Sequence, residues 1–206
     1  EEAFDAIPNP VPTPVTPSKP SKPKDDKPTT GSSFTDVPSG SWYYDDVAYV
    51  YDTGLMTGLT ATAFGPNLST TRGMIVTILW RMENEPVAKH GCPFADVRRG
   101  SYYEQAIAWA SENGIVTGFD ASTFAPDRAI TREQLAAILY RYMGSPTATG
   151  SLTGFTDRAN VSTYATTAMQ WAIGKGYITG IGTKLDPKGN ATRAQVAVII
   201  HRFLTK

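Results

Sequence analysis

Three arginines in this sequence share one local setting, because each directly follows a threonine and the spacing between them is matched. Arg72, Arg132 and Arg193 are separated by steps of 60 and 61 residues. Each threonine is placed to cap a helix, so its arginine takes the first helical position, where free backbone N–H groups and the helix dipole favour an anion. A guanidinium can hold a carboxylate through two parallel hydrogen bonds. The sequence therefore predicts three anion-binding positions.

Acidic and aromatic residues recur ahead of each arginine. The pairs are Asp36 with Trp42, Asp96 with Tyr102, and Asp157 with Tyr164. Carboxylates accept hydrogen bonds from sugar hydroxyls, and flat rings stack on sugar rings, so these residues are candidates for carbohydrate binding. The structural alternatives are helix capping for the acids and core packing for the aromatic residues. Both interpretations stay open at this point.

Four short motifs occur three times in the same order, and such recurrence indicates an internal repeat. The copies are FTDV, FADV and FTDR from Phe34, Phe94 and Phe155; GLMTG, GIVTG and GYITG from Gly54, Gly114 and Gly176; FGP, FAP and LDP from Phe64, Phe124 and Leu185; and TRGM, TREQ and TRAQ from Thr71, Thr131 and Thr192. The repeats therefore span residues 34–93, 94–154 and 155–206. The third repeat departs from the others through Arg158 and one additional residue before its first helix.

Each repeat is expected to fold as two helices, which makes the chain all-α. The first helices are expected at Tyr43–Thr53, Tyr103–Asn113 and Ala165–Lys175, and the second at Thr71–Met82, Thr131–Tyr142 and Thr192–Leu204. The glycine after each first helix suits a left-handed stop. Gln134 and Gln195 complete capping boxes that TRGM lacks. One helix pair buries too little surface to be stable alone, so the three second helices are expected to pack together in one core.

The first 33 residues differ in composition from the repeats. Eight prolines lie between Pro8 and Pro28, and proline favours extended backbone that cannot bury a core. Residues 1–33 are therefore predicted to be a disordered, Pro-rich linker that folding and binding do not require. Its position is compatible with a cargo domain on its N-terminal side.

Composition argues against several classes of function. Lys plus Arg equals Asp plus Glu at 19 each, which argues against bulk electrostatic binding to nucleic acid, and no apolar run is long enough to span a membrane. Cys92 is the only cysteine, and His90 and His201 are the only histidines. His201 aligns with aromatic residues of the other repeats and is expected to pack. Without a nucleophile–base set or a ligand cluster, we expect no catalysis, metal or cofactor.

The motif order resembles the S-layer homology family over residues 34–206. The resemblance implies a pseudo-threefold spindle around a central three-helix bundle. It also implies an extracellular cell-wall module that binds secondary cell-wall polysaccharide, or a peptidoglycan-linked polymer, in grooves between repeats. Such polymers often carry pyruvate ketals, and the family's TRAx arginine contacts the ketal carboxylate. A cell-surface protein-interaction module using the same grooves is the alternative.

The resemblance assigns ligand contact to the three arginines in a definite order of preference. Arg132 ranks first because its repeat follows the family pattern best, Arg193 ranks second, and Arg72 ranks third because of its TRGM context. At the start of a helix, Arg132 is expected to be exposed and to contribute little to the core. Its replacement by alanine is therefore expected to affect binding far more than folding.

Overall fold

The computed structural model describes residues 34–206, and the predictions about residues 1–33 lie outside this range. The described part is mainly helical, with six α-helices and two short 3₁₀ segments and no named strand. The α-helices are α1 (Tyr44–Asp52), α2 (Arg72–Met82), α3 (Glu104–Glu112), α4 (Arg132–Tyr142), α5 (Thr166–Gly174) and α6 (Arg193–Thr205). The 3₁₀ segments η2 (Arg158–Asn160) and η3 (Thr163–Ala165) precede α5. None of the described helices is long and apolar enough to cross a membrane.

Local sequence signals set the ends of these helices as predicted. Thr131 and Thr192 form full capping boxes with Gln134 and Gln195, whereas the Thr71 side chain accepts a hydrogen bond from the Met74 amide without a reciprocal bond. Each first helix is followed by a glycine in the left-handed region, with φ values of 73°, 64° and 68° at 54, 114 and 176. Both the caps and the glycine stops are therefore confirmed.

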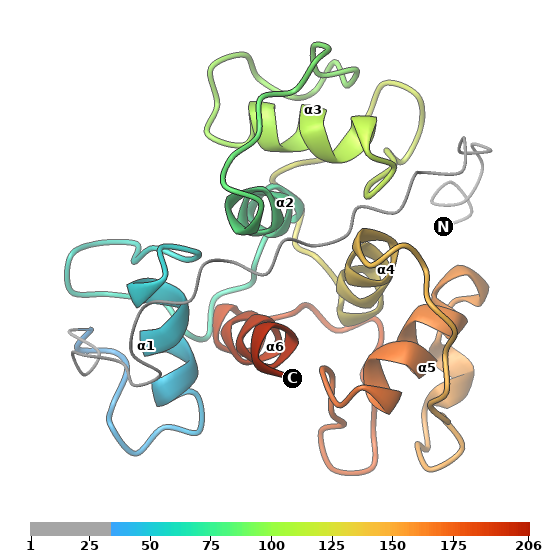
Figure 1. Cartoon of the computed structure of the whole chain (residues 1–206). Helices are drawn as coiled ribbons and strands as arrows, with labels where there is room; N and C mark the ends of the chain where they lie inside the picture. The colour runs from blue at the N-terminus through green and yellow to red at the C-terminus, as the bar shows by residue number, and fades with distance from the viewer. Residues whose placement is uncertain (1–33) are drawn as a thin grey trace.

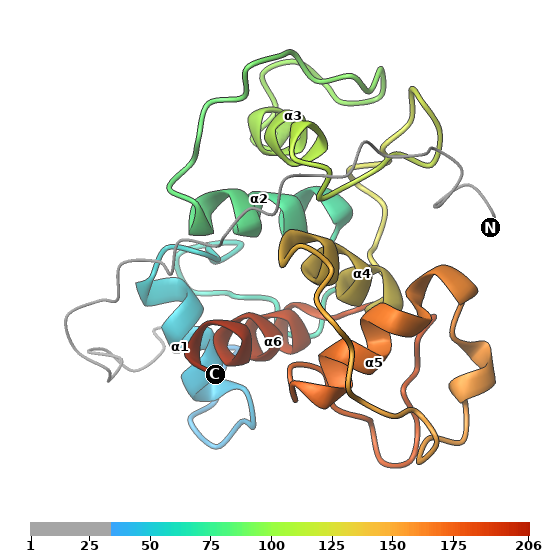
Figure 2. The same cartoon turned by 45° about the vertical axis from the view of Figure 1, so that its right-hand side comes forward.

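The second helices lie at the centre of the molecule and the first helices lie outside them. Figure 1 shows α2, α4 and α6 grouped in the middle, with α1, α3 and α5 around them. The three outer helices pack on inner helices of other repeats: α1 on α6, α3 on α2 and α5 on α4, an arrangement that Figure 2 shows from a second direction. The repeats consequently interlock, because each first helix packs on the second helix of the repeat before it, in cyclic order.

The α1–α6 contact closes this cycle between the first and third repeats. The His201 ring of α6 stacks on Tyr49 of α1 with ring centroids 4.1 Å apart. Its Nδ1 atom lies 2.8 Å from the Asp46 carboxylate of the same helix. His201 thus fills a packing position, as its alignment with aromatic residues predicted.

Side chains of the three central helices belong to one apolar core. Leu79 of α2, Leu139 of α4 and Ile200 of α6 are fully buried in a single cluster. Tyr142 at the end of α4 packs against Phe203 of α6, with ring centroids 6.0 Å apart, and its hydroxyl donates to the Glu83 carboxylate just after α2. The apolar faces that recur in register along the sequence are therefore buried together.

Backbone hydrogen bonds join the segments that lead into the central helices. The amide of each helix-starting arginine donates to a carbonyl of another repeat: Arg72 to Arg128 at 3.0 Å, Arg132 to Gly189 at 3.0 Å and Arg193 to Leu68 at 2.8 Å. Isolated antiparallel bridges accompany these bonds. The start of each central helix is thus fixed against the following repeat.

Candidate binding pockets at the repeat boundaries

The three helix-starting arginines are buried, which contradicts the expectation of exposure. The exposed fractions of Arg72, Arg132 and Arg193 are 0%, 3% and 6%. The physical reason is their position at the start of central helices, which are covered there by a loop of the following repeat. The sequence-based expectation that Arg132 contributes little to the core is therefore wrong.

Each arginine donates hydrogen bonds from two of its nitrogens to carbonyls of that neighbouring loop. The Nε atoms donate to Phe124, Leu185 and Phe64 from Arg72, Arg132 and Arg193, at 2.8, 2.8 and 2.7 Å. The Nη2 atoms donate in the same order to Thr117, Thr179 and Thr57, at 3.3, 2.8 and 2.6 Å. The acceptors belong to the FGP-type and TG motifs, so the recurring motifs form a recurring contact between repeats.

Burial lowers the pKa of all three guanidinium groups. The pKa of Arg72 falls to about 10 through desolvation and the nearby charge of Arg128. Desolvation also lowers the pKa of Arg132, opposed by Asp186 and Asp157, and that of Arg193, opposed by Asp36. Guanidinium pKa values begin so high that all three groups stay cationic at neutral pH.

The recurring aspartates bind the backbone of their own repeat. Both carboxylate oxygens of each accept amide hydrogen bonds at 2.6–2.8 Å: Asp36 from Phe64 and Gly65, Asp96 from Phe124 and Ala125, and Asp157 from Leu185 and Asp186. None of these bonds caps a helix, so the capping alternative is wrong. The carboxylates instead hold the turn whose carbonyl accepts from the buried arginine. Their contact with a ligand stays a prediction.

Two of the three recurring aromatic residues are exposed. Trp42 is 65% exposed and Tyr102 is 56% exposed, so the core-packing alternative is wrong for both. Tyr164 is half-buried, and its hydroxyl donates to the Glu133 carboxylate at 3.0 Å. The structure therefore leaves the rings of Trp42 and Tyr102 accessible to stack on another molecule.

Glu133 at the second helical position of α4 is buried and ties the second repeat to the third. Its carboxylate accepts from the Ser162 amide at 3.0 Å, the Ser162 hydroxyl at 2.8 Å and the Lys188 ammonium at 2.8 Å, in addition to Tyr164. Gly73 and Ala194 stand at the equivalent positions of α2 and α6. This contact is consequently particular to one boundary, and sequence reasoning did not find it.

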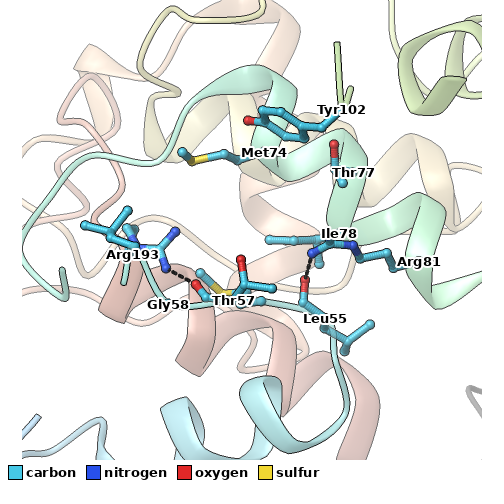
Figure 3. A pocket seen from close by; sticks show the side chains of 11 residues that line it. Leu55, Thr57, Gly58, Met74, Thr77, Ile78, Arg81, Tyr102 and Arg193 are labelled. Carbon is cyan, nitrogen blue, oxygen red and sulfur yellow. Dashed lines mark hydrogen bonds between the residues drawn. The ribbon is translucent and has the colours of Figure 1, made fainter. Parts of the chain in front are cut away.

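One pocket of about 330 Å³ combines parts of all three repeats (Figure 3). Arg193 enters from the third repeat and Tyr102 from the second, while a loop and helix α2 of the first repeat supply the rest. Figure 3 shows Arg193 bonded to the Thr57 carbonyl, with Tyr102 and Arg81 on other sides of the space. The lining residues are Leu55, Met56, Thr57, Gly58, Leu59, Met74, Thr77, Ile78, Arg81, Tyr102 and Arg193.

A second pocket of about 350 Å³ has the same construction one step around the molecule. Here Arg132 comes from the second repeat, Trp42 from the first, and a loop and helix α6 from the third. Its lining residues are Trp42, Arg132, Thr179, Gly180, Ile181, Gln195, Val198, Ile199 and Arg202. The structure thus brings together, in each pocket, an arginine and an aromatic residue that the sequence predicted as site residues.

Each pocket also contains an arginine that sequence reasoning missed. Arg81 and Arg202 stand nine residues after Arg72 and Arg193, and Arg141 stands nine residues after Arg132. This fixed offset is the signal that could have revealed them. The lining of each pocket contains two arginines and no acidic residue. Such a lining attracts anions.

The boundary that contains Arg72 has one additional aromatic neighbour, Phe119, whereas its contact with Phe124 is matched by that of Arg193 with Phe64. The Arg72 guanidinium lies over the rings of Phe119 and Phe124, 4.7 and 4.4 Å from their centroids. Arg128 lies 4.8 Å from the Phe119 centroid. Leu59 and Ile181 stand at the position of Phe119 in the other repeats. These aliphatic side chains cannot form the cation–π contact that Phe119 forms with Arg72.

These features match a known family over most of the repeat region. The profile of the S-layer homology domain matches residues 33–73, 93–136 and 154–197, which together make up more than half of the chain. The chain therefore belongs to the S-layer homology domain family, as the motif order indicated. Family membership implies anchoring to the cell wall.

Relatives of two kinds share this region. An endoglucanase of Bacillus sp. (strain KSM-635) is 34% identical over 178 residues, covering 84% of this chain and 19% of the relative. The surface-layer 125 kDa protein of Lysinibacillus sphaericus is 32% identical over 166 residues, covering 77% of this chain and 14% of the relative. S-layer protein EA1 of Bacillus anthracis is 27% identical over 180 residues, covering 82% and 20%. The chain spans about a fifth or less of these relatives, and the S-layer proteins among them suggest a cell-surface location.

Proposed function

We propose that this chain is a non-catalytic anchoring module that binds an anionic secondary cell-wall polysaccharide in pockets at its repeat boundaries. The observation that carries the proposal is the recurrence of one pocket type, in which two arginines and an exposed aromatic residue meet without any acidic lining residue. Two equivalent pockets in one chain suit a polymer, because consecutive units of one polymer can bind both and raise the overall affinity.

The buried arginine of each pocket has a double role in this proposal. Arg132 and Arg193 use Nε and one Nη2 bond to hold the neighbouring loop. A guanidinium has five N–H donors, so further donors remain, and both side chains line a pocket. A carboxylate of the polymer, such as that of a pyruvate ketal, is their proposed acceptor. The loop contact would hold the guanidinium in one orientation before the ligand arrives.

The exposed aromatic residue supplies the second part of the site. A sugar ring presents apolar C–H groups on one face, and these pack on the flat ring of Trp42 or Tyr102. Both side chains are exposed without a ligand, which leaves their apolar surface in water. Covering that surface is favourable, and the gain adds to the hydrogen bonds of the arginine.

The cyclic contacts support a pseudo-threefold spindle as the scaffold of these sites. Every repeat donates its buried arginine to the next repeat and packs its first helix on the previous one. A cyclic scaffold of this kind places equivalent pockets at equivalent boundaries. The proposed parent protein would thereby be held to the wall by several weak contacts, with no chemical step.

A pull-down with purified sacculi tests the proposal against a protein partner. The chain is mixed with three preparations: protease-treated sacculi, the same sacculi after chemical extraction of secondary polysaccharide, and the extracted polysaccharide as a soluble competitor. We expect binding to the first, loss of binding to the second and competition by the third, without release of reducing sugar. Binding that survives extraction would contradict the proposal. Binding to sacculi that were not treated with protease, together with no binding to the protease-treated sacculi, would also contradict it and would favour the protein-interaction alternative.

A further inference from the structure

The two pockets differ in the partners of their second arginine. In the pocket of Tyr102, Arg81 donates from Nη1 to the Leu55 carbonyl at 3.1 Å, and its Nε lies 3.9 Å from the Glu85 carboxylate. In the pocket of Trp42, the half-buried Arg202 guanidinium has neither a carboxylate nor a carbonyl partner within residues 34–206. Arg81 is therefore already engaged by groups of the protein, whereas Arg202 is available to a ligand.

The sequence explains this difference at a single position. Glu85 follows Arg81 by four residues, beyond the end of α2 at Met82, and the left-handed backbone at Glu85 brings its carboxylate back beside Arg81. Lys206 stands at the corresponding position after Arg202 and donates to the Gly176 carbonyl. A lysine therefore stands where the first repeat has the carboxylate that pairs with its arginine. A ligand anion that reaches Arg202 breaks no ion pair within residues 34–206.

We propose that the pocket formed by Trp42, Arg132 and Arg202 binds a saccharide unit that carries two anionic groups, one held by Arg132 and the other by Arg202. This inference rests on the proposed function and specifies its ligand class. In the pocket of Tyr102 and Arg193, a second ligand anion would compete with the Glu85 carboxylate for Arg81, so this pocket favours a unit with one anionic group. The two pockets are therefore expected to differ in ligand preference, with two anionic groups favoured in the pocket of Trp42 and one in the pocket of Tyr102.

The size of the pocket is consistent with a short ligand. Its volume of about 350 Å³ lies at the lower end of the range for small-molecule sites, which suits one or two sugar units and their substituents. Gln195 also lines this space, and its side-chain oxygen is engaged with the Thr192 amide. Its NH₂ group can then donate to a sugar hydroxyl but cannot neutralise a charge.

Calorimetric titration with three defined saccharides tests this inference on the full chain. The first probe is a methyl glycoside with one pyruvate ketal, and therefore one carboxylate. The second adds a neighbouring uronic acid, and the third adds a phosphate monoester in its place, so that the source of the second anion is distinguished. The proteins are the parent, Arg202→Gln, and Arg99→Gln, which removes the same charge from an exposed position outside both pockets.

We expect the tighter site of the parent and of Arg99→Gln to bind at least one of the probes with two anionic groups about tenfold more tightly than the probe with one. Arg202→Gln should bind all three probes alike, with an unchanged melting temperature. If Arg202→Gln keeps the preference, or if the parent shows none, this inference is overturned and the proposed function stands. If no probe binds the parent at all, the proposed function fails and this inference fails with it.

Discussion

At the scale of single residues, the buried arginines show how one side chain can serve folding and binding together. Arg132 is 3% exposed, yet it borders a pocket and donates two hydrogen bonds to another repeat. Burial of a charge is unfavourable unless hydrogen bonds compensate, and the Leu185 and Thr179 carbonyls provide them. Loss of the side chain would leave these carbonyls without their donor.

Replacement of Arg132 by alanine should therefore reduce stability strongly. We expect a loss of about 3 kcal/mol, because two charge-assisted hydrogen bonds disappear and a cavity forms. Arg132→Lys should recover only part of this, because an ammonium cannot reach both carbonyls with the planar geometry of a guanidinium. Urea unfolding followed by circular dichroism measures both variants. The exposed Arg99→Ala is the control, and an Arg132→Ala protein as stable as this control would refute the structural role.

The aspartates give the molecule a predictable response to acid. Slight desolvation raises the pKa values of Asp36 and Asp157, but amide hydrogen bonds outweigh it and hold them below the ordinary value of 3.8. A group with a lowered folded pKa contributes stability above its unfolded pKa, and this contribution is lost as the pH falls through the folded value. The melting temperature should therefore decrease once the pH is lowered below about 4. The Asp36→Asn/Asp157→Asn variant should have a lower melting temperature than the parent at neutral pH, and its melting temperature should depend less on pH in the acid range. Thermal melts at a series of pH values measure both proteins, and two parallel curves of melting temperature against pH would contradict this prediction.

Residue types and spacing allowed the helix-starting arginines and the aromatic residues of the pockets to be predicted, but not their exposure, nor the presence of Arg81 and Arg202. Recurrence marks Arg72, Arg132 and Arg193 as equivalent regardless of their surroundings. Their burial depends on carbonyls 45 to 136 residues away in the sequence, so no local pattern reports it. The exposure of Trp42 is likewise a property of the assembled repeats, because an isolated tryptophan ahead of a helix is more often buried.

At the scale of the elements, helix ends were predictable and helix partners were not. Capping boxes and left-handed glycines act over three or four residues, so their signals lie within one short stretch of sequence. Helix α1 instead packs on α6, at the opposite end of the described chain. Amphipathic faces show that a helix will pack, but they do not identify the helix on which it packs.

The Glu133 contact predicts that one boundary is stabilised in a way the others are not. Glu133→Ala should lower stability by about 2 kcal/mol or more, because Ser162 and Tyr164 lose a shared buried acceptor and Lys188 loses its ion pair. Asp45→Ala, which removes an exposed acidic side chain from the first turn of α1, is the control. Thermal melts compare the two, and equal melting temperatures would show that the cluster contributes nothing.

At the scale of the whole molecule, the cyclic interlock makes the three repeats one folding unit. Each outer helix packs on a central helix of another repeat, and the buried arginines follow the same cyclic order. Removal of one repeat therefore exposes surfaces on both of the others. This differs from an open array of repeats, in which each unit contacts only its sequence neighbours.

Truncation after residue 154 should consequently abolish cooperative folding. Helix α1 would lose its packing partner α6, and Arg132 would lose both of its side-chain acceptors. We expect the full chain to unfold in a single transition and the truncated chain to show no cooperative transition by circular dichroism. A truncated chain that melts sharply near the temperature of the full chain would show that the first two repeats are stable without closure.

Polymer binding in these pockets is tested most directly by titration of purified wall polysaccharide into the parent chain and into the Trp42→Ala/Tyr102→Ala variant. Both side chains are largely exposed, so their removal should change the melting temperature little. Each lines one of the two pockets, and loss of the aromatic rings on which sugar units stack should weaken polymer binding at least tenfold. Saturable binding by the parent, with this loss in a fully folded variant, is the predicted result. Equal affinity of the parent and the folded variant would place the polymer outside these pockets.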